Sequence, residues 1–171
     1  MHIAPFSASD FAALMAWFPT EAALIQWGGS RLRFPLDEAQ LEEMLAECEG
    51  SPPARLSWTG RLDGRMVAHA QVAFDARHGV ALLSRVAIAP EARGQGLAAP
   101  FLDSIIDRAF AVTGVERLEL NVYTFNDAAL RTYRRLGFRH EGTRRSSVRV
   151  GDERWDTAIF AMLRHERSAA R

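Results

Sequence analysis

Two glycines, Gly94 and Gly96, lie in the segment of the sequence with the clearest chemical use. The segment before them is typical of a strand that ends near Ala89, and an apolar helical pattern begins at Gly96. Glycines in such a turn let backbone N–H groups crowd toward one point, and the first helical turn adds unpaired N–H groups and a positive dipole end. The pattern predicts an anion site for a phosphate or pyrophosphate. An ordinary glycine-rich turn is the structural alternative.

The same glycines also fit a permissive dinucleotide-binding pattern, because Ala99 completes G-x-G-x-x-A. That pattern normally follows the first strand of a domain, whereas about ninety residues precede it here. It also expects an acidic residue at the end of the next strand, where this chain has Val122-Tyr123-Thr124. These two departures make a nucleotide-dependent oxidoreductase the more distant hypothesis.

A second motif follows, in which Asn126, Ala129 and Tyr133 have helical spacing and Gly137 ends the helix. Ala129 and Tyr133 are four residues apart, so they share one helix face. Asn126 stands at the helix start, where its side chain can cap the helix or reach a ligand. A purely structural interpretation, with a cap and two packing residues, remains the alternative for this motif alone.

In this order, and joined by a strand–helix–strand unit, the two motifs resemble the GNAT superfamily of acyl-CoA-dependent N-acyltransferases. The acyl-CoA loop of that family reads Gln or Arg, two residues, Gly, one residue, then Gly or Ala; here it is Arg93-Gly94-Gln95-Gly96-Leu97-Ala98. The resemblance covers about residues 65–163. The closing segment from Glu141 to Asp156 is similar to the ribosomal-protein-alanine and polyamine acetyltransferase branch.

The resemblance implies a role for each matching residue. The backbone of Val86 to Ile88 would pair with the pantetheine arm, and amides from Gly94 to Ala99 would hold the pyrophosphate. Asn126 would reach the pantetheine or thioester, and Tyr133 would lie near the sulfur as the catalytic residue. The predicted cofactor-binding residues are Val86, Ala87, Ile88, Arg93, Gly94, Gln95, Gly96, Leu97, Ala98, Ala99, Asn126 and Ala129.

The implied reaction transfers an acetyl group from acetyl-CoA to a primary amine, which attacks the thioester directly. Tyr133 would protonate the leaving thiolate, and Glu119, His69, His140 or a water chain would remove the amine proton. Asn121 stands where family members that acetylate protein N-termini often have a catalytic glutamate. A non-catalytic acyl-CoA-binding sensor is therefore the alternative function. The histidines and the single cysteine lack metal-ligand spacing, so no metal is predicted.

The elements that must position these residues form an α+β fold. The resemblance implies a mixed, mainly antiparallel sheet of six to seven strands with helices on both faces. Its parallel central pair, residues 79–89 and 116–123, would splay beyond Val86. Periodicity predicts helices over about 96–113 and 127–136.

Length and composition predict one domain, residues 1–171, with balanced charge. About residues 1–50 form a variable helical acceptor region, about 65–163 form the acyl-CoA-binding core, and 165–171 form a frayed tail. Residues 1–50 are acidic and residues 131–154 are basic, but overall neutrality gives no support to nucleic-acid or membrane binding.

One cysteine and no evident leader predict a cytoplasmic protein in a reducing compartment. The expected partner is a small-molecule amine or a protein N-terminus as acceptor. The protein itself is expected to be a monomer or a homodimer.

Overall fold

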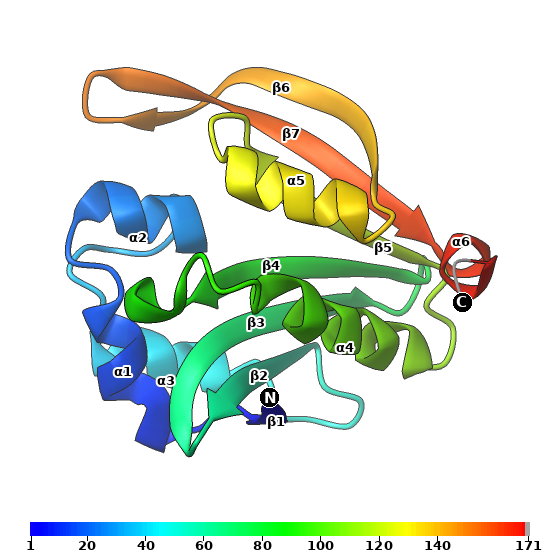
Figure 1. Ribbon diagram of the computed structural model, residues 1–171, viewed down its shortest axis with the longest axis horizontal. Helices are drawn as coiled ribbons and strands as arrows, with labels where there is room; N and C mark the ends of the chain where they lie inside the picture. Colours follow the sequence, from blue (N-terminus) through cyan, green and yellow to red (C-terminus); the bar gives the residue numbers. More distant parts are fainter. Residues whose placement is uncertain (170–171) are drawn as a thin grey trace. The chain divides into compact units, whose positions relative to one another are not determined.

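The computed structural model describes residues 1–169, and the chain packs as two compact units (Figure 1). The first unit comprises Met1–Ala73 and Ser84–Phe101, and the second comprises Phe74–Leu83 and the chain from Leu102 onward. Strands β3 and β4 and helix α4 run from one unit into the other. Hydrogen bonding therefore continues through one seven-stranded sheet, in the order β1-β2-β3-β4-β5-β7-β6.

The first unit combines the N-terminal helices with an antiparallel part of the sheet. The two-residue turn between β2 and β3 is formed by Asp63 and Gly64, whose φ values of 48° and 77° suit a tight hairpin. The elements of this first unit are β1 (His2–Pro5), η1 (Ala8–Asp10), α1 (Phe11–Ala16), α2 (Glu21–Gly28), α3 (Glu38–Ala46), β2 (Arg55–Leu62), most of β3 (Arg65–Asp75), the end of β4 (Val80–Ile88), η2 (Pro90–Ala92) and the start of α4 (Ala98–Ala111).

The second unit contains the parallel strand pair. Val80–Leu83 of β4 pairs with Arg117–Leu120 of β5, and β7 lies antiparallel to both β5 and β6. The parallel register ends at Leu83, whereas the two strands were expected to splay beyond Val86. Besides most of α4, the elements are β5 (Arg117–Tyr123), α5 (Asp127–Arg135), β6 (Arg139–Val150), β7 (Glu153–Leu163) and α6 (Arg164–Ala169). The predicted mixed, mainly antiparallel α+β fold is confirmed.

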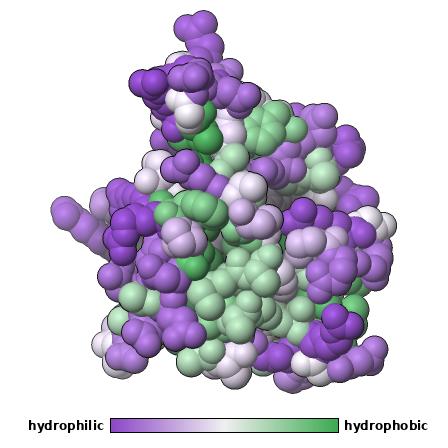
Figure 2. Space-filling model, turned by 90° about the vertical axis from the view of Figure 1, so that its left-hand side faces the viewer, coloured by the Kyte–Doolittle hydropathy of each residue, from purple (hydrophilic) through white to green (hydrophobic). Residues whose placement is uncertain are grey.

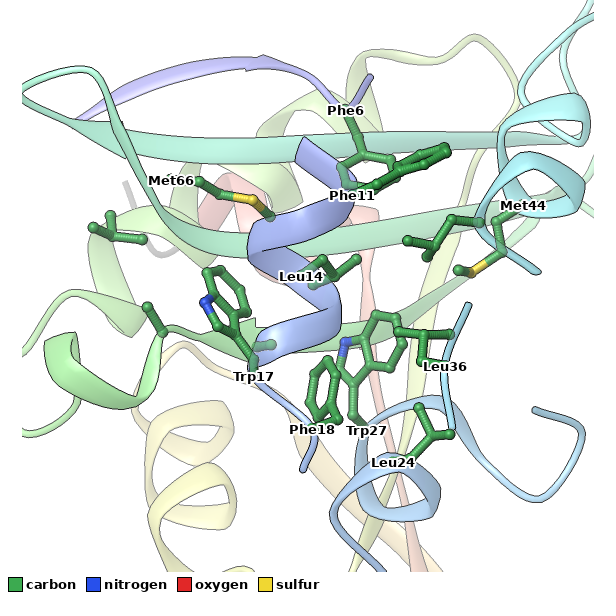
Figure 3. Close-up of a cluster of buried hydrophobic side chains, with 14 of the residues drawn as sticks. Phe6, Phe11, Leu14, Trp17, Phe18, Leu24, Trp27, Leu36, Met44 and Met66 are labelled. Atoms are coloured by element: carbon green, nitrogen blue, oxygen red, sulfur yellow. The ribbon is translucent and has the colours of Figure 1, made fainter. Parts of the chain in front are cut away.

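The core of the first unit is rich in aromatic side chains contributed by the short helices (Figure 3). Trp27 stacks on Phe18 with ring centroids 4.4 Å apart, and Leu14 of α1 is fully buried. These contacts bury the apolar faces of helices that are too short to be stable in isolation. Figure 2 shows the side on which α1 and α2 lie, where green apolar areas alternate with purple hydrophilic ones.

Helices cover both faces of β3, and its side chains point alternately to one face and the other. Gln71 contacts Met44 of α3, and the His69 ring lies 5.6 Å from that of Trp27 in α2. Ala68 points the other way, where a Cβ built on its partner Gly60 would meet Phe101 of α4. The predicted arrangement of helices on both faces holds for this part of the sheet.

Two elements differ from the sequence expectations. The region expected to be helical begins with strand β1, which pairs with β2 from His2↔Arg61 to Pro5↔Trp58. The segment 165–171 was expected to be a frayed tail, but it is helical in α6 as far as Ala169, and residues 170–171 lie outside the described chain. Arg167 of α6 forms ion pairs with Asp103 and Asp107 of α4. Both elements depend on partners distant in sequence, which local periodicity does not reveal.

Replacing Asp10 with alanine should destabilise the fold by about 3 kcal/mol. The Asp10 carboxylate is 1% exposed, accepts a hydrogen bond from Ser7 N and forms an ion pair with Arg61. Its loss leaves the partly buried Arg61 guanidinium without its carboxylate. Urea unfolding measures the change, with Glu42→Ala at an exposed position as control. A loss below about 1 kcal/mol would contradict a structural role for this pair.

Candidate functional site

The glycine-rich loop between β4 and α4 is open on the side that a ligand would approach. Gly94 and Gly96 both have a φ of 75°, which favours glycine, and no atom lies within 4 Å of a Cβ built at either position. All four residues from Arg93 to Gly96 are exposed. The backbone can therefore approach a bound group without obstruction from the protein.

The backbone amides of this loop are free to bind an anion. Within the described chain, no protein acceptor takes a hydrogen bond from the N–H groups of Gly94–Leu97, and α4 begins its ladder with Phe101 N to Leu97 O at 3.2 Å. The Arg93 and Gln95 side chains brace the loop by donating to Ile88 O and Glu91 O. Unpaired amides at a helix start favour phosphate groups, so this loop has the features that a phosphate site needs, and the site itself stays a prediction.

Strand β4 contains a backbone reversal, by which we mean one peptide group flipped by a left-handed residue, immediately before the predicted pantetheine-binding segment. Arg85 has a φ of 50°, and its carbonyl oxygen lies 2.7 Å from Trp27 Nε1 and 3.0 Å from His69 Nδ1. In a planar trans peptide, the C=O and the following N–H point in opposite directions. The Val86 N–H therefore points away from Trp27 and His69.

His69 is a neutral structural residue rather than a general base. Its ring is fully buried, and desolvation lowers its pKa to about 4. Because Arg85 O can only accept, Nδ1 carries the proton, and Nε2 accepts from the Ser57 hydroxyl at 3.1 Å. Trp27 is also buried, and its indole N–H donates to Arg85 O.

Helix α5 in the second unit carries the other motif. The Asn126 side chain caps the helix by accepting a hydrogen bond from Ala129 N at 3.2 Å. Tyr133 is 6% exposed and lies edge-on to Phe138, with ring centroids 5.8 Å apart. Burial raises the pKa of the Tyr133 hydroxyl well above its ordinary value.

The Tyr133 hydroxyl has a free hydrogen-bonding capacity. No protein partner is recorded for it in the part of the chain that the structure describes, yet no fully buried side-chain oxygen there lacks a partner. The small exposed area of this residue must therefore include the hydroxyl. This group can donate to a ligand while the ring remains packed.

The other candidate bases form local contacts. Glu119 forms an ion pair with Arg117 at 3.1 Å, and His140 Nε2 lies 3.0 Å from the Thr143 hydroxyl. The Asn121 side-chain oxygen accepts a hydrogen bond from Arg144 at 2.7 Å. These contacts do not identify Glu119, His140 or Asn121 as a general base.

The two motifs therefore belong to separate units. Val86–Ile88 and Arg93–Ala99 lie in the first, and Asn126, Ala129 and Tyr133 lie on α5 in the second. The contribution of Arg85 escaped sequence reasoning, because nothing in the pattern Ser84-Arg85-Val86 distinguishes a left-handed residue from ordinary strand. No group of metal-ligating side chains capable of holding an ion is found among the described residues.

A family model described as the Acetyltransferase (GNAT) family matches residues 19–138, which is more than half of the chain. The chain belongs to this family. The GNAT assignment agrees with the order of elements and with both sequence motifs. Across residues 1–169, no helix of this GNAT protein is long and apolar enough to cross a membrane.

Solved structures agree with the GNAT fold and include the expected branch. A spermidine N-acetyltransferase from Vibrio cholerae in complex with CoA and spermine is 16% identical, with a TM-score of 0.83 over 98% of this chain and 97% of that chain. A ribosomal-protein-alanine N-acetyltransferase from Brucella melitensis is 20% identical, with a TM-score of 0.79 over 95% and 99%. The Escherichia coli ribosomal-protein-S18-alanine N-acetyltransferase is 26% identical, with a TM-score of 0.70 over 95% and 92%.

The buried His69 should make the stability of the GNAT domain depend on pH. Its pKa of about 4 lies below the unfolded value of 6.5, so the unfolded chain binds the proton first. The contribution is complete above pH 6.5 and falls as the pH drops toward 4, by about 3 kcal/mol in total. Urea unfolding across this range should show that difference between wild type and His69→Gln. Parallel stability curves for the two proteins would contradict the assignment.

Proposed function

We propose that this protein transfers an acetyl group from acetyl-CoA to a primary amine. The observation that carries the proposal is the open loop at Gly94 and Gly96, which offers backbone amides at the start of α4. Membership of the GNAT family supports the reaction class. Neighbours named for spermidine and for ribosomal-protein alanine support an amine acceptor.

The order of elements sets the direction of the bound donor. The loop follows the C-terminal end of β4, so a pyrophosphate at Gly94–Ala99 places the pantetheine arm beside the strand, running back toward Val86. The register with β5 ends at Leu83, so Val86–Ile88 can add the arm like an extra strand. Three residues of strand span about 10 Å, which brings the acyl end close to Val86.

The reaction joins the amine nitrogen to the thioester carbon and breaks the carbon–sulfur bond. The neutral amine attacks, negative charge develops on the carbonyl oxygen, and CoA leaves as a thiolate that takes up a proton. The Val86 N–H, held in place by the reversal at Arg85, donates to the developing oxyanion. Solvent receives the amine proton, since His69 is buried and neutral and Glu119 is paired with Arg117.

Tyr133 serves the leaving group as a hydrogen-bond donor. Burial raises the pKa of its hydroxyl, whereas an ordinary thiol titrates near 8.5, so complete proton transfer to the thiolate is uphill. A hydrogen bond from the unpartnered hydroxyl still stabilises the developing negative charge on sulfur. The effect therefore belongs at the low end of general-acid catalysis.

The alternative function is a non-catalytic acyl-CoA-binding sensor, which is favoured by Asn121 in place of a glutamate and by its contact with Arg144. Release of free thiol from acetyl-CoA with a panel of primary amines decides between the two. An enzyme releases thiol at a rate that depends on the amine. A sensor is stabilised by acetyl-CoA and releases none above background.

Gly96→Val should abolish the binding of acetyl-CoA. At one hundred times its dissociation constant, the ligand should stabilise the wild type by about 2.7 kcal/mol, seen as a higher melting temperature. The branched side chain occupies the open space through which the backbone meets the pyrophosphate.

The matched control is Gly64→Val. Gly64 has a φ of 77° and equally open surroundings, so this variant carries similar backbone strain outside the loop. It should retain the full shift produced by acetyl-CoA. If acetyl-CoA stabilises both variants equally, the loop does not hold the pyrophosphate; a wild type stabilised by NADH alone would point to the oxidoreductase instead.

Tyr133→Phe should lower kcat about 10-fold while the affinity for acetyl-CoA stays nearly unchanged. The substitution removes the hydroxyl and keeps the ring against Phe138. Steady-state rates and a thermal shift with acetyl-CoA measure the two quantities. A loss below about threefold would assign Tyr133 a packing role only.

A further inference from the structure

Two arginines of the first unit converge on one buried glutamine. Gln71 is fully buried, and its Oε1 accepts hydrogen bonds from Arg85 at 2.9 Å and from Arg55 at 3.4 Å. Arg55 also donates to the Ser84 hydroxyl at 3.3 Å. Gln71 in turn donates to Met44 Sδ, which fixes its orientation. The two guanidinium groups are thus held beside each other by side chains from β2, β3 and β4.

The cluster has an excess of positive charge. Glu47 forms an ion pair with Arg55, but no carboxylate among residues 1–169 lies within ion-pair distance of Arg85. Desolvation, followed by the charge of Arg55, lowers the pKa of Arg85 to about 10. The half-buried Cys48 lies near enough to feel the same charges, but burial raises the pKa of its thiol, so it supplies no anion. Two cations and one carboxylate leave a net charge of about one positive unit.

Arg85 has unused donors that face solvent. A guanidinium carries five N–H groups, and the only hydrogen bond recorded for that of Arg85 in the described chain is the one to Gln71. Because no fully buried side-chain nitrogen among the described residues lacks a partner, the unused nitrogens reach solvent. A planar ligand with two oxygens can bind such a fork at both oxygens.

The cluster lies next to the acyl end of the donor under the proposed function. Arg85 directly precedes Val86, and the arm runs from the loop back to Val86. An acceptor must bring its amine to this same point. A carboxylate a few bonds from the amine would therefore meet the Arg85 guanidinium.

We propose that Arg85 and Arg55 form a carboxylate subsite that selects amino acids as acceptors over amines lacking a carboxylate. The proposal rests on the proposed acetyl transfer and goes beyond it by naming the acceptor class. The acceptor carboxylate binds the unused face of Arg85, and Arg55, oriented by Gln71 and Ser84, completes the positive field. Arg85 acts here on specificity through its side chain, while its carbonyl positions Val86.

The test compares amino acids with their carboxamides, which have nearly the same shape and lack the charge. Glycine, alanine and leucine are assayed against glycinamide, alaninamide and leucinamide with acetyl-CoA as donor. For wild type, kcat/KM should favour the acid. Arg85→Gln and Arg55→Gln should each lower the acid-to-amide ratio at least about 10-fold, as expected for a lost charge-assisted hydrogen bond, and Arg85→Lys should keep part of it.

Arg65→Gln is the matched control, because it removes an arginine whose side chain is 79% exposed on β3. It should leave the acid-to-amide ratio unchanged. The ratio itself corrects for any general loss of activity in the cluster variants. Melting temperatures confirm that each variant is folded, and two cluster variants on different strands guard against the failure of one.

The outcomes separate the subsite from the proposed function. If no amine is acetylated, the transferase proposal fails, and calorimetric binding of alanine to wild type and Arg85→Gln still tests the subsite. Weaker binding to the variant supports it, and equal binding or none overturns it. An acid-to-amide ratio that stays at the wild-type value in all four variants also overturns the proposal. The proposal is also overturned if Arg85→Gln affects only reactions in which succinyl-CoA is the donor, because the subsite would then hold the carboxylate of the acyl group.

Discussion

The hydrogen bonds from Trp27 and His69 to the Arg85 carbonyl are the interaction on which the candidate site depends. A left-handed backbone conformation costs a non-glycine residue about 1 kcal/mol, so it persists only where the surroundings determine it. Here two buried donors, one from α2 and one from β3, point at a single oxygen. They reverse one peptide within β4 and thereby aim the next N–H away from the core.

That reversal links the N-terminal helices to the backbone of β4. Trp27 is held by stacking on Phe18, and His69 is held by Ser57 and by the Phe6 ring at 4.8 Å. The helices of residues 1–50 therefore shape the backbone of β4. Met44 of α3 and Glu47, which directly follows that helix, orient Gln71 and Arg55. A polar cluster in a core is stable only when its buried groups are paired, and this one leaves donors unpaired only where solvent reaches them.

The open loop and the reversed peptide have different physical origins. At Gly94 and Gly96 the conformation is available because glycine lacks a Cβ, so no tertiary contact is needed to hold it. At Arg85 the conformation is imposed by hydrogen bonds from residues 58 and 16 positions away in the chain. The first kind of feature is visible in a sequence, and the second is not.

The sequence by itself determined the elements that rest on local chemistry. The Asp63-Gly64 turn, the glycine loop, the Asn126 cap and the end of α5 near Gly137 follow from short-range preferences. Periodicity located α4 and α5, and the resemblance carried by the two motifs indicated the α+β fold. Only the tertiary structure decided β1, α6, the neutral state of His69, the free Tyr133 hydroxyl and the pairing of Arg85 with Arg55 around Gln71. Each of these depends on burial or on a partner distant in sequence, and neither quantity is encoded in the spacing of neighbouring residues.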